Sequence, residues 1–162
     1  MDPNFDWEGR VLLKGESMFP TLQDGDSLYL SSAKPPFESG DIFLFYEKGE
    51  WITHRAIQRN GVFKLKGDAN FFEDALECQR EVLEKNVIAK VVGYSRRGSE
   101  CLWGAQGQPF KGIYAFFSSP FFSSPRGSSQ DLTLGRRILR KGILLFFKGL
   151  NQVERLWLKF KI

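Results

Sequence analysis

Residues 40–57 read GDIFLFYEKGEWITHRAI, and this stretch decides the fold. The run Asp41–Tyr46 is apolar and rich in Ile and Phe, whereas Trp51–Ile57 alternates loosely between apolar and polar residues. Between them, Lys48–Glu50 supplies turn residues. Short apolar or alternating runs bounded by turn residues are typical of β-strands. The stretch therefore predicts two strands of a β domain.

The same pattern recurs on both sides of this stretch. Further strands are predicted at Val11–Lys14, Ser27–Ser31, Val62–Leu65 and Val87–Tyr94. Turn residues separate them at Gln23–Asp26, Pro35–Gly40, Arg59–Gly61 and Gly67–Asn70. Short strands at this spacing predict a compact, mainly β domain of mixed or antiparallel pairing over residues 1–103. A helical turn is an option within Phe71–Lys85.

Residues 104–130 differ from the β domain in composition, because Gly, Ser, Pro and Phe dominate. The near-repeat FFSSPFFSSP at 116–125 cannot be one helix, since proline breaks a helix interior. We interpret this segment as a linker or an exposed apolar loop. It either packs over the β domain or faces a membrane or a partner.

Residues 131–162 are predicted as a basic amphipathic helix, with Asp131 or Thr133 as its N-cap. Steps of three and four place one set of apolar residues on one face: Ile138, Leu139, Gly142, Ile143, Phe146, Leu150, Val153, Leu156, Trp157 and Phe160. A basic polar face opposite Trp, Phe and Leu is typical of a helix in a membrane interface. A helix docked on its own domain remains the equal alternative. Nucleic acid is not an expected partner, because the rest of the chain is acidic and the apolar face is extensive.

Charge is unevenly distributed along the 162 residues. The chain carries a net charge of +4, but residues 135–162 contain eight basic residues and one acidic residue, which leaves the remainder acidic. The acidic N-terminus has no targeting signal, and no run approaches the ~18 apolar residues of a membrane span. We therefore expect a peripheral membrane or cytoplasmic location.

The cysteines Cys78 and Cys101 are too far apart for a CxxC site, and with a single histidine we expect no metal or other cofactor.

Three segments carry residues suited to acyl transfer: GESMFPTL at 15–22, THRAI at 53–57 and KGDAN at 66–70. Ser17 lies where the chain must turn, and a serine becomes a nucleophile when a base is within hydrogen-bond reach. His54 is the sole imidazole, and histidine titrates near pH ~6.5. A carboxylate such as Asp68 or Asp74 can orient the second ring nitrogen of such a base.

Together these motifs resemble the signal peptidase family of serine proteases, over roughly residues 10–94. GESMFPTL resembles the box that carries the family's nucleophile, which points to Ser17. THRAI resembles the region that holds the base, a lysine in the bacterial type and a histidine in the endoplasmic-reticulum and archaeal type, so His54 places the chain with the latter. KGDAN resembles the box whose Asp supports catalysis, which maps to Asp68, and Asp74 matches a second acid downstream.

The resemblance implies a β-clip-like fold and a serine endopeptidase that cleaves leader or signal peptides of a preprotein after small residues. In that scheme the Ser17 N–H donates to the oxyanion, and Met18, Phe43 and Phe45 are candidate walls of the substrate pocket, or else core residues. Some relatives supply a second oxyanion donor from a hydroxyl at the position of Gly15, which this chain lacks. The family's transmembrane anchor has no counterpart here, and the C-terminal helix is a candidate replacement. A non-catalytic module that binds peptides or membranes with the same fold is the alternative.

Overall fold

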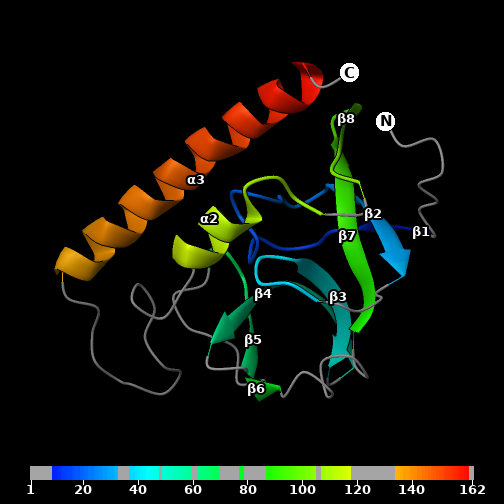
Figure 1. Cartoon of the computed structure of the whole chain (residues 1–162), viewed down its shortest axis with the longest axis horizontal. Helices are drawn as coiled ribbons and strands as arrows, with labels where there is room; N and C mark the ends of the chain where they lie inside the picture. The colour runs from blue at the N-terminus through cyan, green and yellow to red at the C-terminus, as the bar shows by residue number, and fades with distance from the viewer. Residues whose placement is uncertain are drawn as a thin grey trace.

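A computed structural model describes the chain over residues 9–32, 37–47, 49–59, 62–69, 77–78, 87–104, 107–117 and 134–160. Within these residues, eight strands form one sheet and two helices cover part of it (Figure 1). The strands are β1 Gly9–Leu12, β2 Ser27–Ser32, β3 Ile42–Glu47, β4 Glu50–Arg59, β5 Val62–Lys66, β6 Glu77–Cys78, β7 Val87–Arg96 and β8 Ser99–Leu102. The helices are α2 Lys111–Phe117 and α3 Leu134–Phe160. The predicted mainly β fold is confirmed, and the strand pairs are antiparallel.

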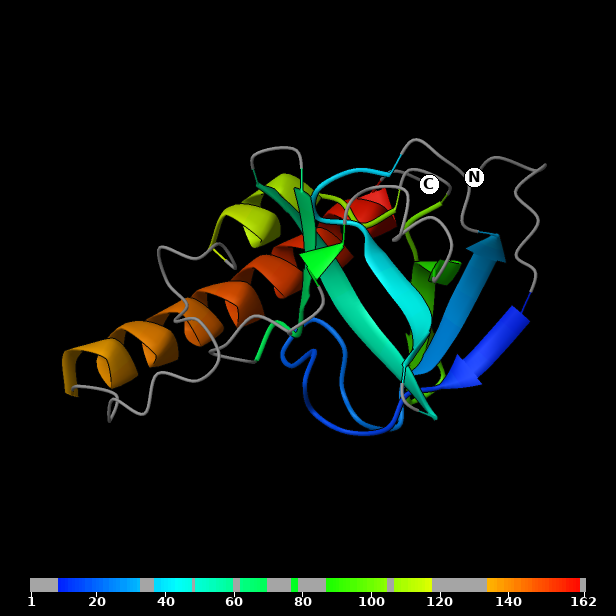
Figure 2. The same ribbon diagram turned by 90° about the horizontal axis from the view of Figure 1, so that it is seen from below.

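Strand β7 joins the two halves of the sheet, whose order is β1-β2-β7-β3-β4-β5-β6. It pairs with β2 along one edge and with β3 along the other, where Phe43 lies opposite Lys90. Further along β7, the edge that pairs with β3 pairs with β8 instead, and there Gly93 lies opposite Leu102. The two halves are inclined to each other in Figure 2, and the loop that follows β1 lies at one end of them.

Two hydrophobic clusters fill the domain, because alternate side chains of a strand point to opposite faces. The first cluster contains Leu13, Met18, Leu22, Leu28, Ile42, Val91, Tyr94, Cys101 and Trp103. The second contains Phe37, Phe43, Phe45, Ala56, Phe63 and Leu65. Neighbouring residues of β3 thus belong to different clusters, and Cys101 is a free, buried thiol.

Helix α3 packs on the domain through its C-terminal half, while its N-terminal half extends beyond the sheet in both views (Figures 1 and 2). Helix α2 lies between α3 and β4, and its buried Tyr114 ring contacts the Phe147 ring of α3 at a centroid distance of 4.9 Å. At the start of α2, the Lys111 ammonium lies 2.9 Å from the buried carboxylate of Asp41. This ion pair joins α2 to the residue that precedes β3.

The six predicted strands and the C-terminal helix are confirmed, whereas β6, β8 and α2 were not predicted. Helix α2 lies inside the segment interpreted as a linker or loop at 104–130. The proposed N-caps Asp131 and Thr133 lie outside the described residues. Neither described helix is both long and apolar enough to cross a membrane.

Candidate active site

Ser17 lies on the loop between β1 and β2, which is closed at its base. The Leu13 N–H donates to the Asp26 carbonyl at 2.8 Å, and the Gly25 N–H donates to the Leu13 carbonyl at 3.0 Å. The buried Asp26 carboxylate also pairs with Arg96 of β7 at 2.5 Å. Ser17 itself is half-buried. The loop is therefore anchored to the sheet beneath it while Ser17 keeps contact with solvent.

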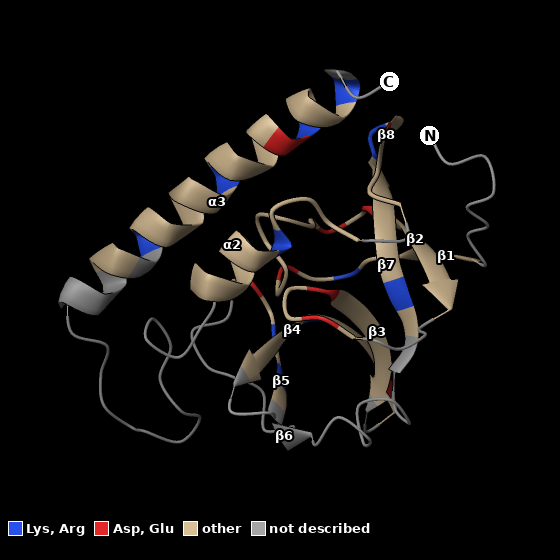
Figure 3. Ribbon diagram, in the orientation of Figure 1, with Lys and Arg blue, Asp and Glu red and all other residues tan. Residues whose placement is uncertain are grey.

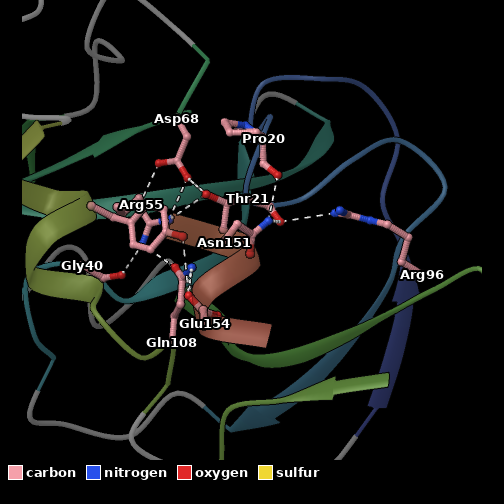
Figure 4. A network of polar contacts seen from close by, with 10 residues as sticks. Pro20, Thr21, Gly40, Arg55, Asp68, Arg96, Gln108, Asn151 and Glu154 are labelled. Carbon is pink, nitrogen blue, oxygen red and sulfur yellow. Dashed lines mark hydrogen bonds and ion pairs between the residues drawn. The ribbon is translucent and has the colours of Figure 1, made fainter. Parts of the chain in front are cut away.

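The loop that carries Ser17 is joined directly to the turn that carries Asp68. The Ala69 N–H donates to the Ser17 carbonyl at 2.8 Å. The Thr21 hydroxyl donates to Asp68 Oδ2 at 2.6 Å (Figure 4). The first and third motifs, which lie 47 positions apart at Thr21 and Asp68, are thus neighbours in the fold.

Arg55 brings the second motif to the same place through an ion pair with Asp68 that is fully buried. The guanidinium donates to the two carboxylate oxygens from Nε at 2.8 Å and from Nη2 at 2.7 Å. Burial lowers the pKa of Arg55, but the Asp68 carboxylate, together with the weaker effects of Tyr114 and Glu154, raises it overall. Two parallel charge-assisted hydrogen bonds fix both groups in one orientation. Arg55 is therefore a permanent cation that holds the Asp68 turn in place.

His54 precedes Arg55 on β4 and lies on the opposite face of the strand. It is 6% exposed, lies opposite Phe43 on β3, and its ring is 6.0 Å from the Phe45 ring by centroids. The Ser17 side chain, by contrast, is half-buried on its loop. Catalytic hydrogen bonds are often long without substrate and tighten when substrate binds.

The structure gives Asp68 a different contact from the one predicted. Its carboxylate, expected to orient His54, bonds to Arg55 and Thr21. Oδ1 accepts from Arg55 Nε, and Oδ2 accepts from Arg55 Nη2 and from the Thr21 hydroxyl. Asp74, the second candidate, lies outside the described residues.

The three candidate pocket residues are buried. Met18 is 1% exposed and belongs to the first cluster, while Phe43 and Phe45 belong to the second. In this structure they pack the core, which was the other role left open for them. Their contact with substrate stays a prediction.

Sequence reasoning did not single out three buried polar residues that extend the network towards α3. Gln108 accepts from Arg55 Nη1 at 2.9 Å and donates to Glu154 at 3.0 Å (Figure 4). The Asn151 amide donates to the carbonyls of Pro20, at 3.1 Å, and Thr21, at 3.3 Å. Glu154 and Asn151 are three positions apart. In a predicted helix this spacing places two residues on the same face, and it is the sequence signal that could have grouped them.

Glu154 has an altered acidity. Burial raises its pKa to about 7, although the hydrogen bond from Gln108 and the charge of Arg55 act in the opposite direction. Arg55 also lies 4.8 Å from the centre of the Tyr114 ring, so this cation is enclosed by α2, α3 and the Asp68 turn. The site is therefore tied to both helices through one buried guanidinium.

The β domain thus gathers a Ser loop, a His-Arg strand and a Gly-Asp turn around one buried ion pair. The chain is similar to the signal peptidase complex catalytic subunit sec11 of Dictyostelium discoideum, with 28% identity over 109 residues. That match covers 54% of this chain, and the chain spans 61% of the relative's length. No protein-family profile matches the chain, and no solved structure matches it. The similarity is distant and covers only part of each chain.

Proposed function

We propose that this protein is a serine endopeptidase that cleaves leader or signal peptides after small residues, with Ser17 as nucleophile and His54 as general base. The observation that carries the proposal is the convergence of the three motifs. Ser17 is joined to Ala69 by its backbone, and Asp68 is joined to Thr21 and Arg55 by side chains. Convergence of such motifs on one loop cluster is what acyl transfer requires.

The reaction follows from the chemistry of the two residues. His54 takes the proton of the Ser17 hydroxyl as the oxygen attacks the scissile carbonyl, and the resulting oxyanion accepts a hydrogen bond from the Ser17 N–H. One such donor typically lowers the barrier by about 2.7–4 kcal/mol. The tetrahedral intermediate breaks its C–N bond, and His54 gives the proton to the leaving amine. Water then attacks the acyl-enzyme by the same steps and frees the acid and Ser17.

Arg55 and Asp68 act in this scheme as positioning residues. They hold the Gly-Asp turn against the Ser17 loop and do not touch the reacting atoms. Since Asp68 is occupied by Arg55, Asp74 is the carboxylate that we propose to orient His54. Strand β1 leads into the Ser17 loop and pairs with β2 alone among the described strands, so its other edge can receive an extended peptide.

The proposal is tested by mass spectrometry of products from a library of leader peptides with small residues at the cleavage point. The wild type should cleave, and Ser17→Ala and His54→Ala should both reduce the rate to background in a folded chain. Ser17→Ala should keep the wild-type melting temperature, whereas His54→Ala, at a buried position, should lower it. Ser99→Ala, at an exposed serine of β8, is the matched control and should keep full activity. Wild-type activity in Ser17→Ala would reject the mechanism.

A second experiment distinguishes the proposed roles of Asp68 and Asp74. Asp68→Asn leaves the Arg55 cation buried without its carboxylate, so the free energy of unfolding should fall by about 3–5 kcal/mol. Asp74→Asn should leave stability nearly unchanged and lower kcat at every pH. A stable but inactive Asp68→Asn variant would return the orienting role to Asp68.

A non-catalytic peptide-binding module is the second candidate, and the burial of His54 within β4, where it is 6% exposed, favours it. Binding of library peptides with no wild-type cleavage, and equal affinity in Ser17→Ala, would support this alternative.

A further inference from the structure

Helix α3 docks on the domain with a narrow face of mixed polarity. Phe147, Asn151 and Glu154 are buried, and Leu158 is half-buried. These positions are separated by steps of four, three and four, so they form one stripe along the helix. The face that meets the β domain is therefore different from the apolar face predicted from the sequence.

The predicted apolar face of α3 is left exposed. Ile138 and Leu156 of that face are 62% and 55% exposed, and Leu145, which was not part of the prediction, is 69% exposed. Steps of seven and eleven place the three residues in one row opposite the docked stripe. A second exposed row lies beside it and contains Leu139, Phe146, Val153 and Trp157. A soluble helix normally turns such residues inward, so this surface needs a partner.

Helix α2 and the residue before it extend this surface. The Phe110 ring lies 6.1 Å from the Trp157 ring, and the Phe117 ring lies 4.8 Å from the Phe146 ring. Next to these contacts, Ile113 is 40% and Phe116 is 61% exposed. We name the combined area of the two exposed α3 rows, Phe110, Ile113 and Phe116 the two-helix apolar surface.

Positive charge borders the two-helix apolar surface. Lys141, Lys148 and Lys159 are exposed and follow each other at steps of seven and eleven, so they form a stripe along α3 between its docked and apolar faces. Figure 3 shows basic residues along the helix and one acidic segment. The acidic residue in the sequence of α3 is Glu154. That acid is buried against Arg55 and Gln108, so it does not offset the lysines at the surface.

We propose that the two-helix apolar surface lies on an anionic lipid bilayer, with α3 parallel to the membrane plane. Apolar side chains enter the acyl boundary while the lysine stripe contacts lipid phosphates, as in interfacial helices. A second copy of the chain fits less well, because pairing these faces would bring two basic stripes together. This inference goes beyond the proposed peptidase activity and stands independently of it.

The test is sedimentation of the full chain with vesicles of phosphatidylcholine containing phosphatidylglycerol, compared with phosphatidylcholine alone. The chain should bind the anionic vesicles, and binding should weaken as salt rises. Replacing Lys141, Lys148 and Lys159 with Gln should lower the affinity for anionic vesicles by about a hundredfold, since each such charge near the surface contributes about fivefold. Replacing Leu145, Leu156 and Phe116 with Ser should abolish binding without loss of folding, because these side chains are exposed.

Two controls make the outcome decisive. Trp51→Ser removes an exposed aromatic residue of β4, away from both helices, and should bind as the wild type does. Ser17→Ala should also bind unchanged, which separates this inference from the proposed function. Equal binding by the Leu145/Leu156/Phe116 variant would overturn the proposal, and so would a wild type that dimerises through this surface and ignores vesicles.

Discussion

The side-chain amide of Asn151 donates a hydrogen bond to the Pro20 carbonyl at 3.1 Å, across 131 positions of sequence. It donates a second one to Thr21, whose hydroxyl in turn bonds to Asp68. The loop that carries Ser17 is thereby fixed to α3 on one side and to the Asp68 turn on the other.

Removing the Asn151 amide should loosen the Ser17 loop. Asn151→Leu keeps a similar volume but loses both donors, and we expect the free energy of unfolding to fall by about 1–3 kcal/mol in urea titrations. If the proposed function holds, leader-peptide cleavage should fall by up to about a hundredfold, because a misplaced nucleophile is costly. Gln152→Leu, at the exposed neighbouring position, is the control and should change neither quantity. Wild-type stability in Asn151→Leu would show that the two hydrogen bonds contribute nothing.

Glu154 should make stability depend on pH around neutrality. Its pKa is raised from 4.5 to about 7, so between these values the folded chain holds a proton that the unfolded chain has released. The stability contributed by this proton is complete below about pH 4.5 and is lost as pH rises through about 7. Compared with Glu154→Gln, the wild type should lose up to about 3 kcal/mol of unfolding free energy between pH 4.5 and 8. Gln cannot titrate, so parallel pH curves for the two proteins would contradict the assignment.

Gly40 should tolerate no side chain, because helix α2 begins against it. A Cβ at this position would lie 2.4 Å from the Lys111 carbonyl oxygen, and its φ is +96°. Gly49 has a φ of +89° with nothing within 4 Å of a Cβ, so Gly49→Ala is a matched control for backbone strain alone.

In both alanine variants the free energy of unfolding should fall by about 1 kcal/mol, because alanine is strained in the left-handed backbone conformation. Only Gly40→Ala should also displace α2. We expect this displacement to lower the free energy of unfolding by about a further 2 kcal/mol, which is within the range for overpacking. The near-ultraviolet circular dichroism of Tyr114 and its neighbours should change in that variant alone. Equal losses in the two variants would show that the close contact with Lys111 is easily relieved.

The sequence predicted the strands well because their periodicity is local. It missed β8, a four-residue strand after the turn at Arg97 and Gly98, both of which have positive φ. A two-residue turn with positive φ at both positions usually carries Asn-Gly or Asp-Gly, so the Arg-Gly pair gave only a weak hairpin signal. Helix α2 was missed for a different reason: its seven residues are stabilised by burial of Tyr114 against Phe147, which local propensity does not report.

The candidate site was only partly predictable. The motifs marked Ser17, His54 and Asp68 as candidates, but they did not predict that Asp68 pairs with Arg55, since that depends on which face of β4 meets the Asp68 turn. Asn151 and Glu154 belong to no motif. Periodicity selects the most apolar face of a helix as the buried one, whereas here polar residues with hydrogen-bond partners occupy the docked face.

The contact between Asn151 and Pro20 has a consequence for synthesis on the ribosome. Translation at about 5–20 residues per second delivers Pro20 roughly ten seconds before Asn151. During that interval the Ser17 loop lacks its helical support, whatever else has folded. The nascent chain therefore emerges with its candidate nucleophile not yet locked in place, and the site is completed only when α3 has left the exit tunnel.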